Sequence, residues 1–479
     1  MNTLILNHDY KLVNDYDRVI LLRLSAGKYK EYAPYFMHPF LAKFLSMFNG
    51  RGEEGQKLEE YGFTTDDIKK LTKIFTNNKK MCIGYAGEKY YFPKDVLVYN
   101  NNGTTRMGLE NDYNCAQPYN FNRKRFALPK TIVYIINLKC YTNCIYCYAN
   151  RKCSYHLMST AKIIDIIQEA KKIGILDFTI SGGEFFLQKD WDIILKALLD
   201  NNYEPEISTK IPLAEDDLLT IKNCGLKEIQ FSLDTLNADL AKKTLAVKDN
   251  YVTKITESIK FADSIGLKVT LKPTFCKYTC TINNLKEVLN FAGTLKNLKR
   301  VTVSTAGKSI YLSEATWDDI RPSIKQVEEI EQYIEKANYP FEVIPDSNVV
   351  YKEEISNDNA FKNRSLCTAN LDGFILLPDG KITLCEELYW NDDFILGDVN
   401  TQRILEIWNS EKALKLWDIA NDDFPSYSAC QTCDDVKSCR QGLGVCWKMV
   451  MQAYGKENIF YPDPRCPKAP IPTQNIIDQ

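Results

Sequence analysis

The sequence predicts an α/β protein of several domains, built around a parallel sheet. Strand-like and helix-like stretches alternate over residues 126–345, and repeated βα units place their strands parallel in one sheet. Three cysteines in the spacing C-x3-C-x2-C follow the first of these strands, and seven more lie between residues 360 and 470. The pattern therefore predicts an α/β domain at 126–345 and a cysteine-rich domain at 346–479.

The composition narrows the possible partners and location. The 479 residues include 60 Lys or Arg and 62 Asp or Glu, a balance that does not favour nucleic acid as a partner. No apolar run reaches transmembrane length, and the first residues lack the basic start and apolar core of a secretory signal. We therefore expect no membrane partner and a cytoplasmic location. Sixteen cysteines in such a chain indicate metal or redox chemistry.

Residues 1–95 predict a small winged-helix-like domain. A strand is expected at 18–24, a helix at 39–48 that Asn49-Gly50 ends, and a hairpin at 81–92 that turns near Ala86-Gly87. Thr64 and Asp67 form a capping pair that opens a second helix. A polar, turn-rich stretch follows, and we interpret residues 96–125 as a linker.

The phrase His38-Pro39 before an apolar helix resembles the RiPP recognition element, a module that binds leader peptides of ribosomally made peptides. That resemblance implies a precursor peptide as partner, often added to a sheet edge. The segment through Lys94 carries 15 Lys or Arg against 11 Asp or Glu, which is compatible with an acidic peptide. A plain capping domain is the alternative interpretation.

The βα units of the central domain are expected in a definite order. Apolar, β-branched runs predict strands at 131–138, 176–181, 203–208, 227–233, 268–274 and 300–305. Helical periodicity predicts helices between them, for example at 159–173, 213–223, 250–265 and 282–293. Active sites of parallel barrels gather at the carboxyl ends of the strands, so the residues there are the first candidates for function.

Cys140, Cys144 and Cys147 lie on the loop after the first of these strands. Three thiolates can hold three irons of a four-iron cubane and leave the fourth iron open, because a fully protein-held cluster uses four cysteines. With Tyr146 before the last cysteine, this loop resembles the signature of the radical S-adenosylmethionine (SAM) enzymes. A zinc site is the alternative, although zinc motifs usually contain two C-x2-C pairs.

The radical SAM resemblance implies a partial (β/α)6 barrel and a 4Fe–4S cluster whose open iron is chelated by the amino and carboxylate groups of SAM. In that family an electron from the cluster cleaves SAM to a 5′-deoxyadenosyl radical, so an electron donor such as flavodoxin or ferredoxin is expected. The resemblance also implies SAM-binding residues at strand ends: Tyr146, Gly182, Gly183, Glu184, Ser208, Lys210, Ser232 and Asp234. Relatives often carry an Arg for the SAM carboxylate after the fourth strand. Here Lys242-Lys243 stands in that region, and that role stays unassigned.

The carboxyl-terminal cysteines have their own spacing. Twelve residues separate Cys367 from Gly380, four separate Gly380 from Cys385, and C-x2-C-x5-C follows at Cys430, Cys433 and Cys439. The Asp379-Gly380 turn predicts a hairpin over 374–384. This arrangement resembles the SPASM extension, except that six residues rather than three separate Cys439 from Cys446. Structural zinc is the alternative.

The SPASM resemblance implies two auxiliary 4Fe–4S clusters. One would be held by Cys430, Cys433, Cys439 and Cys466, and the other by Cys367, Cys385 and Cys446. The fourth position of the second cluster could be open to a substrate thiolate, or could be filled by one of the remaining cysteines, Cys82, Cys115, Cys153, Cys224, Cys276 or Cys280. Some relatives carry a cysteine about six residues after the first, where this chain has Gly373. Glu386 occupies the position of a carboxylate that acts as a catalytic base in sulfatase-maturing relatives.

Together the three resemblances imply a radical SAM peptide maturase with a leader-binding domain and a SPASM domain. A thioether from a substrate Cys to carbon is the favoured product, because the second auxiliary cluster has only three motif ligands. Carbon–carbon or carbon–oxygen cyclisation, a formylglycine-forming sulfatase maturase, and a non-catalytic Fe–S or zinc protein are the alternatives. The Gly182-Gly183-Glu184 segment argues against the last of these.

Overall fold

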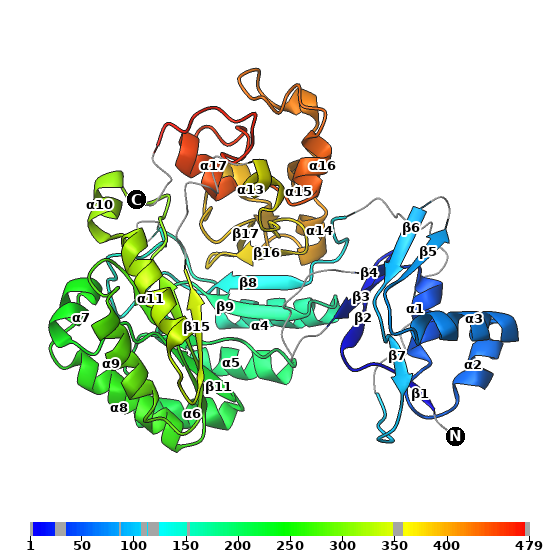
Figure 1. The fold of residues 1–479 in the computed structure, drawn as a ribbon, viewed down its shortest axis with the longest axis horizontal. Helices are drawn as coiled ribbons and strands as arrows, with labels where there is room; N and C mark the ends of the chain where they lie inside the picture. Colours follow the sequence, from blue (N-terminus) through cyan, green and yellow to red (C-terminus); the bar gives the residue numbers. More distant parts are fainter. Residues whose placement is uncertain are drawn as a thin grey trace. The chain divides into compact units, whose positions relative to one another are not determined.

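The computed structural model describes residues 3–23, 35–85, 88–106, 113, 124–150, 154–347 and 358–474 (Figure 1). The chain divides into two compact units, Met1–Leu128 and Pro129–Gln479. Each unit is described by itself. Among the described residues, no helix combines the length and apolarity needed to cross a lipid bilayer.

The first unit mixes short strands with three helices. Its strands are β1 (Leu4–Leu6), β2 (Tyr10–Asp15), β3 (Arg18–Arg23), β4 (Tyr35–Met37), β5 (Met81–Tyr85), β6 (Glu88–Phe92) and β7 (Leu97–Tyr99). Its helices are α1 (Pro39–Ser46), α2 (Glu54–Glu60) and α3 (Thr65–Phe75). Strands β2, β3 and β4 form one antiparallel sheet, β5 and β6 form a hairpin, and β1 pairs with β7.

Local sequence signals explain these helices. His38 caps α1 by accepting from the Phe40 N–H at its Nδ1 atom, 3.1 Å away, and Pro39 occupies the first turn. Thr64 and Asp67 form the predicted capping box of α3. His38 and Pro39 therefore form the start of helix α1 in this structure. The strand, both helices and the 81–92 hairpin are confirmed, while Ala86-Gly87 lies outside the described residues.

Part of the stretch interpreted as a linker is ordered structure. Residues 97–99 form β7 on β1. The buried Asp15 carboxylate accepts from the main-chain N–H groups of Ala127 and Leu128 at 2.8 and 3.0 Å, and from Arg18 Nε at 2.7 Å. The end of the first unit is thus tied to β2 and β3.

The second unit begins with β8 and carries the alternating pattern. Its strands are β8 (Thr131–Ile135), β9 (Asp177–Ser181), β10 (Ser208–Thr209), β11 (Glu228–Phe231), β12 (Lys268–Leu271), β13 (Thr274–Phe275), β14 (Leu298–Thr305), β15 (Glu342–Asp346), β16 (Gly373–Leu376), β17 (Lys381–Thr383) and β18 (Gly397–Asp398). Its α-helices are α4 (Thr160–Lys172), α5 (Trp191–Asp200), α6 (Glu215–Cys224), α7 (Ala238–Leu245), α8 (Tyr251–Ser264), α9 (Ile282–Ala292), α10 (Glu314–Ile320), α11 (Ile324–Lys336), α13 (Asp358–Lys362), α14 (Ile404–Trp408), α15 (Glu411–Trp417), α16 (Val436–Gln441) and α17 (Trp447–Tyr454). Short 3-10 turns lie at Phe185–Leu187, Asp392–Phe394 and Asn421–Asp423.

The central strands form the predicted parallel α/β core. Strands β10, β11, β12 and β14 pair in parallel, with β13 and β15 also on β14, and β8 pairs in parallel with β9. Figure 1 shows helices such as α5, α6, α8 and α9 around the outside of these strands. The strand predicted at 203–208 is too long, because only Ser208 and Thr209 pair with β11. The strand β15, which pairs with β14, was not predicted.

The cysteine-rich part joins the same framework through one strand. The predicted Asp-Gly hairpin is β16 and β17, with Gly380 at φ +96°, and β16 pairs in parallel with β8. In Figure 1 the helices α14 to α17 gather around this hairpin. The strand that leads into the C-x3-C-x2-C loop is therefore also the strand that carries the cysteine-rich part.

Candidate active site

A cavity of about 530 Å³ opens at the carboxyl ends of the parallel strands. Cys140, Cys144 and Cys147 all line it. So do the Gly182-Gly183-Glu184 segment and residues that follow the other central strands. Three side chains from the cysteine-rich part complete the wall: Glu386, Glu387 and Lys448.

Main-chain hydrogen bonds fix the cysteine loop to helix α7. The N–H groups of Asn143 and Ile145 donate to the carbonyls of Leu245 and Thr244, at 2.8 and 3.0 Å. Thr142 Oγ1 lies 3.2 Å from Cys144 Sγ. The main chain of the cysteine loop is therefore held by Thr244 and Leu245, which do not line the cavity.

The two glycines after β9 are required by close approach of the chain to itself. A Cβ on Gly182 would lie 2.5 Å from the Asn137 carbonyl oxygen, and one on Gly183 only 2.2 Å from that of Lys139. Gly182 also adopts φ +109°, which favours glycine. The Gly183 and Glu184 N–H groups donate to those same two carbonyls at 2.6 and 2.7 Å. These two hydrogen bonds fix the position of the Glu184 loop relative to the start of the cysteine loop.

Glu184 is a buried carboxyl with one unused oxygen. Its Oε2 accepts from Thr209 Oγ1 at 3.0 Å and from the Lys210 N–H at 3.2 Å, whereas Oε1 has no hydrogen-bond partner among the described residues. Burial raises the pKa of Glu184 to about 7. A buried acceptor without a donor costs free energy, so the site suits a ligand that brings a positively charged N–H group.

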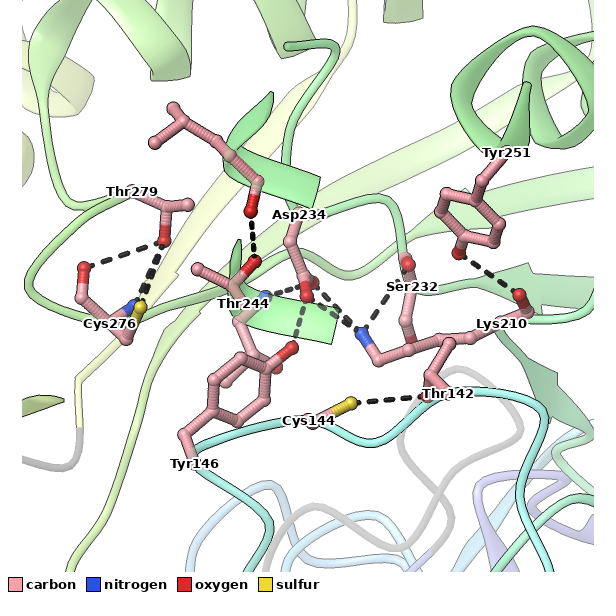
Figure 2. Close-up of polar contacts among 12 residues, drawn as sticks. Thr142, Cys144, Tyr146, Lys210, Ser232, Asp234, Thr244, Tyr251, Cys276 and Thr279 are labelled. Carbon is pink, nitrogen blue, oxygen red and sulfur yellow. Dashed lines mark hydrogen bonds and ion pairs between the residues drawn. The ribbon is translucent and has the colours of Figure 1, made fainter. Parts of the chain in front are cut away.

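A second network, shown in Figure 2, centres on Asp234. Its side chain has no exposed surface and accepts from Lys210 Nζ at 2.9 and 3.0 Å, from the Thr274 N–H at 2.9 Å and from the Tyr146 hydroxyl. Burial is the largest single influence and acts to lower the pKa of Lys210, but Asp234, Cys144 and Glu184 together outweigh it, so the pKa is raised. Lys210 is thus held as a cation at the cavity wall.

The predicted SAM-binding side chains differ in where they lie. Tyr146, Ser208, Lys210 and Ser232 line the cavity. Asp234 is not among the residues that line the cavity, and it accepts from Lys210 and Tyr146, which do line it. A direct contact between Asp234 and SAM stays a prediction.

Neither lysine of the stretch Lys242-Lys243 faces the cavity. Lys242 forms ion pairs with Asp239 and Asp249, and Lys243 Nζ lies 3.4 Å from the centre of the Tyr278 ring. The cations that line the cavity from the described residues are Lys210, Lys272 and Lys448.

The wall from the cysteine-rich part carries two adjacent carboxyls. Glu386 Oε2 lies 3.3 Å from the Tyr148 hydroxyl and 3.5 Å from Ser181 Oγ. Glu387 is buried and pairs with Lys448. The sequence analysis selected Glu386 but did not select Glu387, Lys448 or Tyr148. Glu387 lies two residues after Cys385, and Lys448 lies two residues after Cys446.

The seven carboxyl-terminal thiols fall into two sets. We define the inner set as Cys367, Cys385 and Cys446, and the outer set as Cys430, Cys433, Cys439 and Cys466. Cys446 interacts electrostatically with Cys367 and Cys385, and Cys466 interacts with the other three outer thiols. A Cβ on Gly444 would lie 2.9 Å from Cys367 Cβ, so the chain before Cys446 packs closely on Cys367. The assignment of one 4Fe–4S cluster to each set stays a prediction.

The residues considered for the fourth ligand of the inner set lie in different parts of the structure. A Cβ at Gly373 would lie 1.9 Å from Thr131 Oγ1, which excludes a side chain there while β16 pairs with β8. Cys276 and Cys280 are buried in the hydrophobic core, and Cys224 lines a separate surface groove. Cys82 belongs to the first unit, and Cys115 and Cys153 lie outside the described residues.

The described thiols do not converge on one point. Among the described residues, no three His, Cys, Asp or Glu side chains converge as ligands of one metal ion. The thiolates of a 4Fe–4S cluster need not converge in this way, because each binds a different iron. Arg440 is 7% exposed beside Cys430 and Cys439, and its Nε and Nη2 donors have no acceptor among the described residues. Cluster sulfides would supply one.

Comparison with known proteins identifies two domains. Residues 134–292 match the radical SAM superfamily, and residues 367–434 match the SPASM iron–sulfur cluster-binding domain. The chain is 31% identical over 159 residues to a probable GTP 3′,8-cyclase of Methanococcus maripaludis, covering 33% of this chain and 52% of that protein. It is 32% identical over 167 residues to the GTP 3′,8-cyclase of Campylobacter jejuni, covering 34% and 51%. The chain thus spans about half the length of the curated relatives it matches.

Among solved structures, the fold is similar to that of Streptococcus suis SuiB bound to S-adenosylmethionine. The TM-score is 0.60 at 14% sequence identity, with all of both chains covered. SuiB bound to its precursor peptide SuiA gives 0.59 at 16%, covering 98% of this chain. The domains imply SAM, a 4Fe–4S cluster and auxiliary Fe–S clusters as cofactors. This chain therefore contains a radical SAM enzyme domain joined to a SPASM iron–sulfur cluster-binding domain.

Proposed function

We propose that the protein is a radical SAM maturase that removes hydrogen from a ribosomally made precursor peptide and installs a cross-link. The observation that carries this proposal is the shared cavity. The three thiols after β8 and the residues beside Cys385 and Cys446 line one space of about 530 Å³. A peptide side chain in that space lies between the SAM site and the inner set.

The residues present fit the cofactors. Cys140, Cys144 and Cys147 would hold the SAM-binding cluster, which supplies the electron that cleaves SAM to a hydrogen-abstracting radical. The unused Oε1 of Glu184 would accept an N–H of the iron-bound SAM amino group, and Lys210, fixed by Asp234, suits the carboxylate that other relatives bind with Arg. Ser208, Ser232 and Tyr146 complete the pocket around the nucleoside.

Forming one link removes two hydrogens from the peptide. One leaves as a hydrogen atom, and the other as a proton and an electron. We assign the proton to Glu386, which lies on the cavity wall beside Tyr148, and the electron to the auxiliary sites. An electron donor such as flavodoxin or ferredoxin would restart the cycle.

A thioether is the product that the inner set favours. This set contains three thiols, and Gly373 excludes the fourth found in some relatives. An iron without a protein ligand there would accept a substrate Cys thiolate, since thiolates are favoured iron ligands. Carbon–carbon or carbon–oxygen cyclisation is the second candidate, and the radical SAM residues serve it equally.

The first unit is proposed to bind the leader of the peptide. Its sheet β2-β3-β4 ends in the strands β2 and β4, and an extended peptide can add to such an edge. A formylglycine-forming maturase would not need this unit.

Co-expression with candidate precursor peptides, followed by mass spectrometry, tests the proposal. The full chain should remove two hydrogens per link, about 2 Da, and fragmentation should locate the bond. A chain that starts at Pro129 should lose peptide modification but still cleave SAM. Unchanged peptide mass with inverted stereochemistry would indicate epimerisation instead, and full modification by the shortened chain would rule out the leader-binding role.

The raised pKa of Glu184 predicts a pH-dependent affinity for SAM. Burial raises the pKa of this carboxyl to about 7, and its ionised form accepts a hydrogen bond from an amino N–H more strongly than its protonated form. SAM affinity should therefore fall as the pH drops below 7. Anaerobic equilibrium binding at pH 6 and pH 8 measures this. Glu184→Gln should bind SAM more weakly and with little pH dependence, and an unchanged pH profile in this variant would contradict the assignment.

A further inference from the structure

The inner and outer thiol sets differ in the groups that donate to their sulfur atoms. Lys468 Nζ lies 3.2 Å from Cys433 Sγ, and Arg364 Nη2 lies 3.2 Å from Cys439 Sγ. Each is a cationic donor aimed at a thiol of the outer set. Such charge-assisted hydrogen bonds are about twice as strong as neutral ones.

Arg440 brings a third positive charge to the outer set. Its guanidinium lies beside Cys430 and is held over the rings of Phe424 and Trp447, at 4.8 and 4.9 Å from their centres. The side chain is 7% exposed, and two of its nitrogens have no acceptor among the described residues. A buried cation with free donors is stabilised by a nearby anion, which the outer set would provide once it holds a cluster.

The inner set has neutral donors instead. Each of its thiols interacts with a main-chain N–H group, namely those of Ala369, Glu387 and Met449. Among the described residues, the cationic side chains that donate to a thiol sulfur, Arg364 and Lys468, both donate to the outer set.

The cations nearest the inner set are already matched by carboxylates. Lys448 pairs with Glu387, and Arg465 donates to both carboxylate oxygens of Asp463 at 2.9 Å. Their charges are therefore largely neutralised where they lie. Carboxylates also lie near the outer set, with Asp434 and Asp435 near Lys468 and Asp463 near Arg440, but this set combines three cations with direct approach to sulfur.

We propose that these cations give the outer cluster a higher reduction potential than the inner one, an inference that rests on the proposed ligand sets. Reduction adds one negative charge to a 4Fe–4S cluster, and donors or positive charges near its sulfurs stabilise that charge. A single electron given to the two auxiliary clusters is then held by the outer cluster. The inner cluster, which lies beside the cavity, stays oxidised.

Redox titration of the full-length, anaerobically reconstituted protein, followed by electron paramagnetic resonance, tests this proposal. The signal lost in Cys433→Ser identifies the outer cluster. In the unsubstituted protein its midpoint potential should be the higher of the two auxiliary values. Lys468→Met should lower that potential alone, by about tenfold in the one-electron equilibrium constant, or about 59 mV.

Lys437→Met is the matched control. Lys437 lies near the same set but pairs with Asp418 at 3.7 Å, with its side chain 71% exposed, so its loss should leave both potentials unchanged. Lys468→Arg should preserve the outer potential. Lys468 is exposed. The iron content of each variant will show that it carries its clusters. The proposal is overturned if the inner cluster has the higher potential, or if Lys468→Met and Lys437→Met behave alike. Because potentials are measured without peptide, a failure of the proposed peptide chemistry would leave this test intact.

Discussion

Replacing Cys144 by Ala should abolish SAM cleavage while leaving the chain folded. Cys144 lines the cavity, and the loop that carries it is held by main-chain bonds to α7 that do not involve the thiol. With only Cys140 and Cys147 left, the SAM-binding cluster should not be retained. We expect no 5′-deoxyadenosine, and a fall in iron from about twelve to about eight per chain if three 4Fe–4S clusters form.

Cys224→Ala provides the control for that experiment. This thiol lies on α6 beside a surface groove and does not line the cavity. Its replacement should leave iron content and SAM cleavage unchanged. Continued production of 5′-deoxyadenosine by Cys144→Ala would refute the assignment of the cluster loop.

Asp234→Asn should weaken SAM binding at least tenfold and destabilise the fold. The amide can still accept from the Thr274 N–H, but it leaves the Lys210 ammonium without its buried counter-charge. Removing one partner of a buried ion pair costs about 3–5 kcal/mol, because the remaining charge is left uncompensated. SAM affinity by anaerobic equilibrium binding and the midpoint of thermal unfolding measure the two effects.

The double variant Lys210→Met with Asp234→Asn separates the two roles. Without the buried ammonium, most of the lost stability should return, whereas SAM affinity should stay low because no cation faces the carboxylate from this position. Lys242→Met, which removes an exposed cation outside the cavity, should change neither property. Wild-type SAM affinity in the double variant would exclude Lys210 as the carboxylate partner.

The features that were predicted from the sequence are those fixed by short spacings. The C-x3-C-x2-C loop, the Gly182-Gly183 turn and the Asp379-Gly380 hairpin each encode their geometry within a few residues. The resemblance at the strand ends selected Ser208 and Lys210, which line the cavity, but missed Thr209, which donates to Glu184.

Long-range pairings could not be read from local pattern. Nothing near Gly373 indicates that this residue lies against Thr131, or that β16 joins β8. The pairing of Glu387 with Lys448 likewise joins residues 61 positions apart. Such contacts depend on the folded arrangement of whole elements, because the residues involved have ordinary local sequences.

The parallel pairing of β16 with β8 has a mechanical consequence. The strand that feeds the SAM-binding cysteines and the strand between two inner thiols share one hydrogen-bonded ladder, from Thr131 with Gly373 to Tyr134 with Leu376. A hinge between the SAM-binding cysteine loop and the inner set would have to break main-chain hydrogen bonds of this ladder. This ladder therefore fixes the distance between the two cysteine regions, and any opening that admits the proposed peptide has to come from elsewhere in the chain.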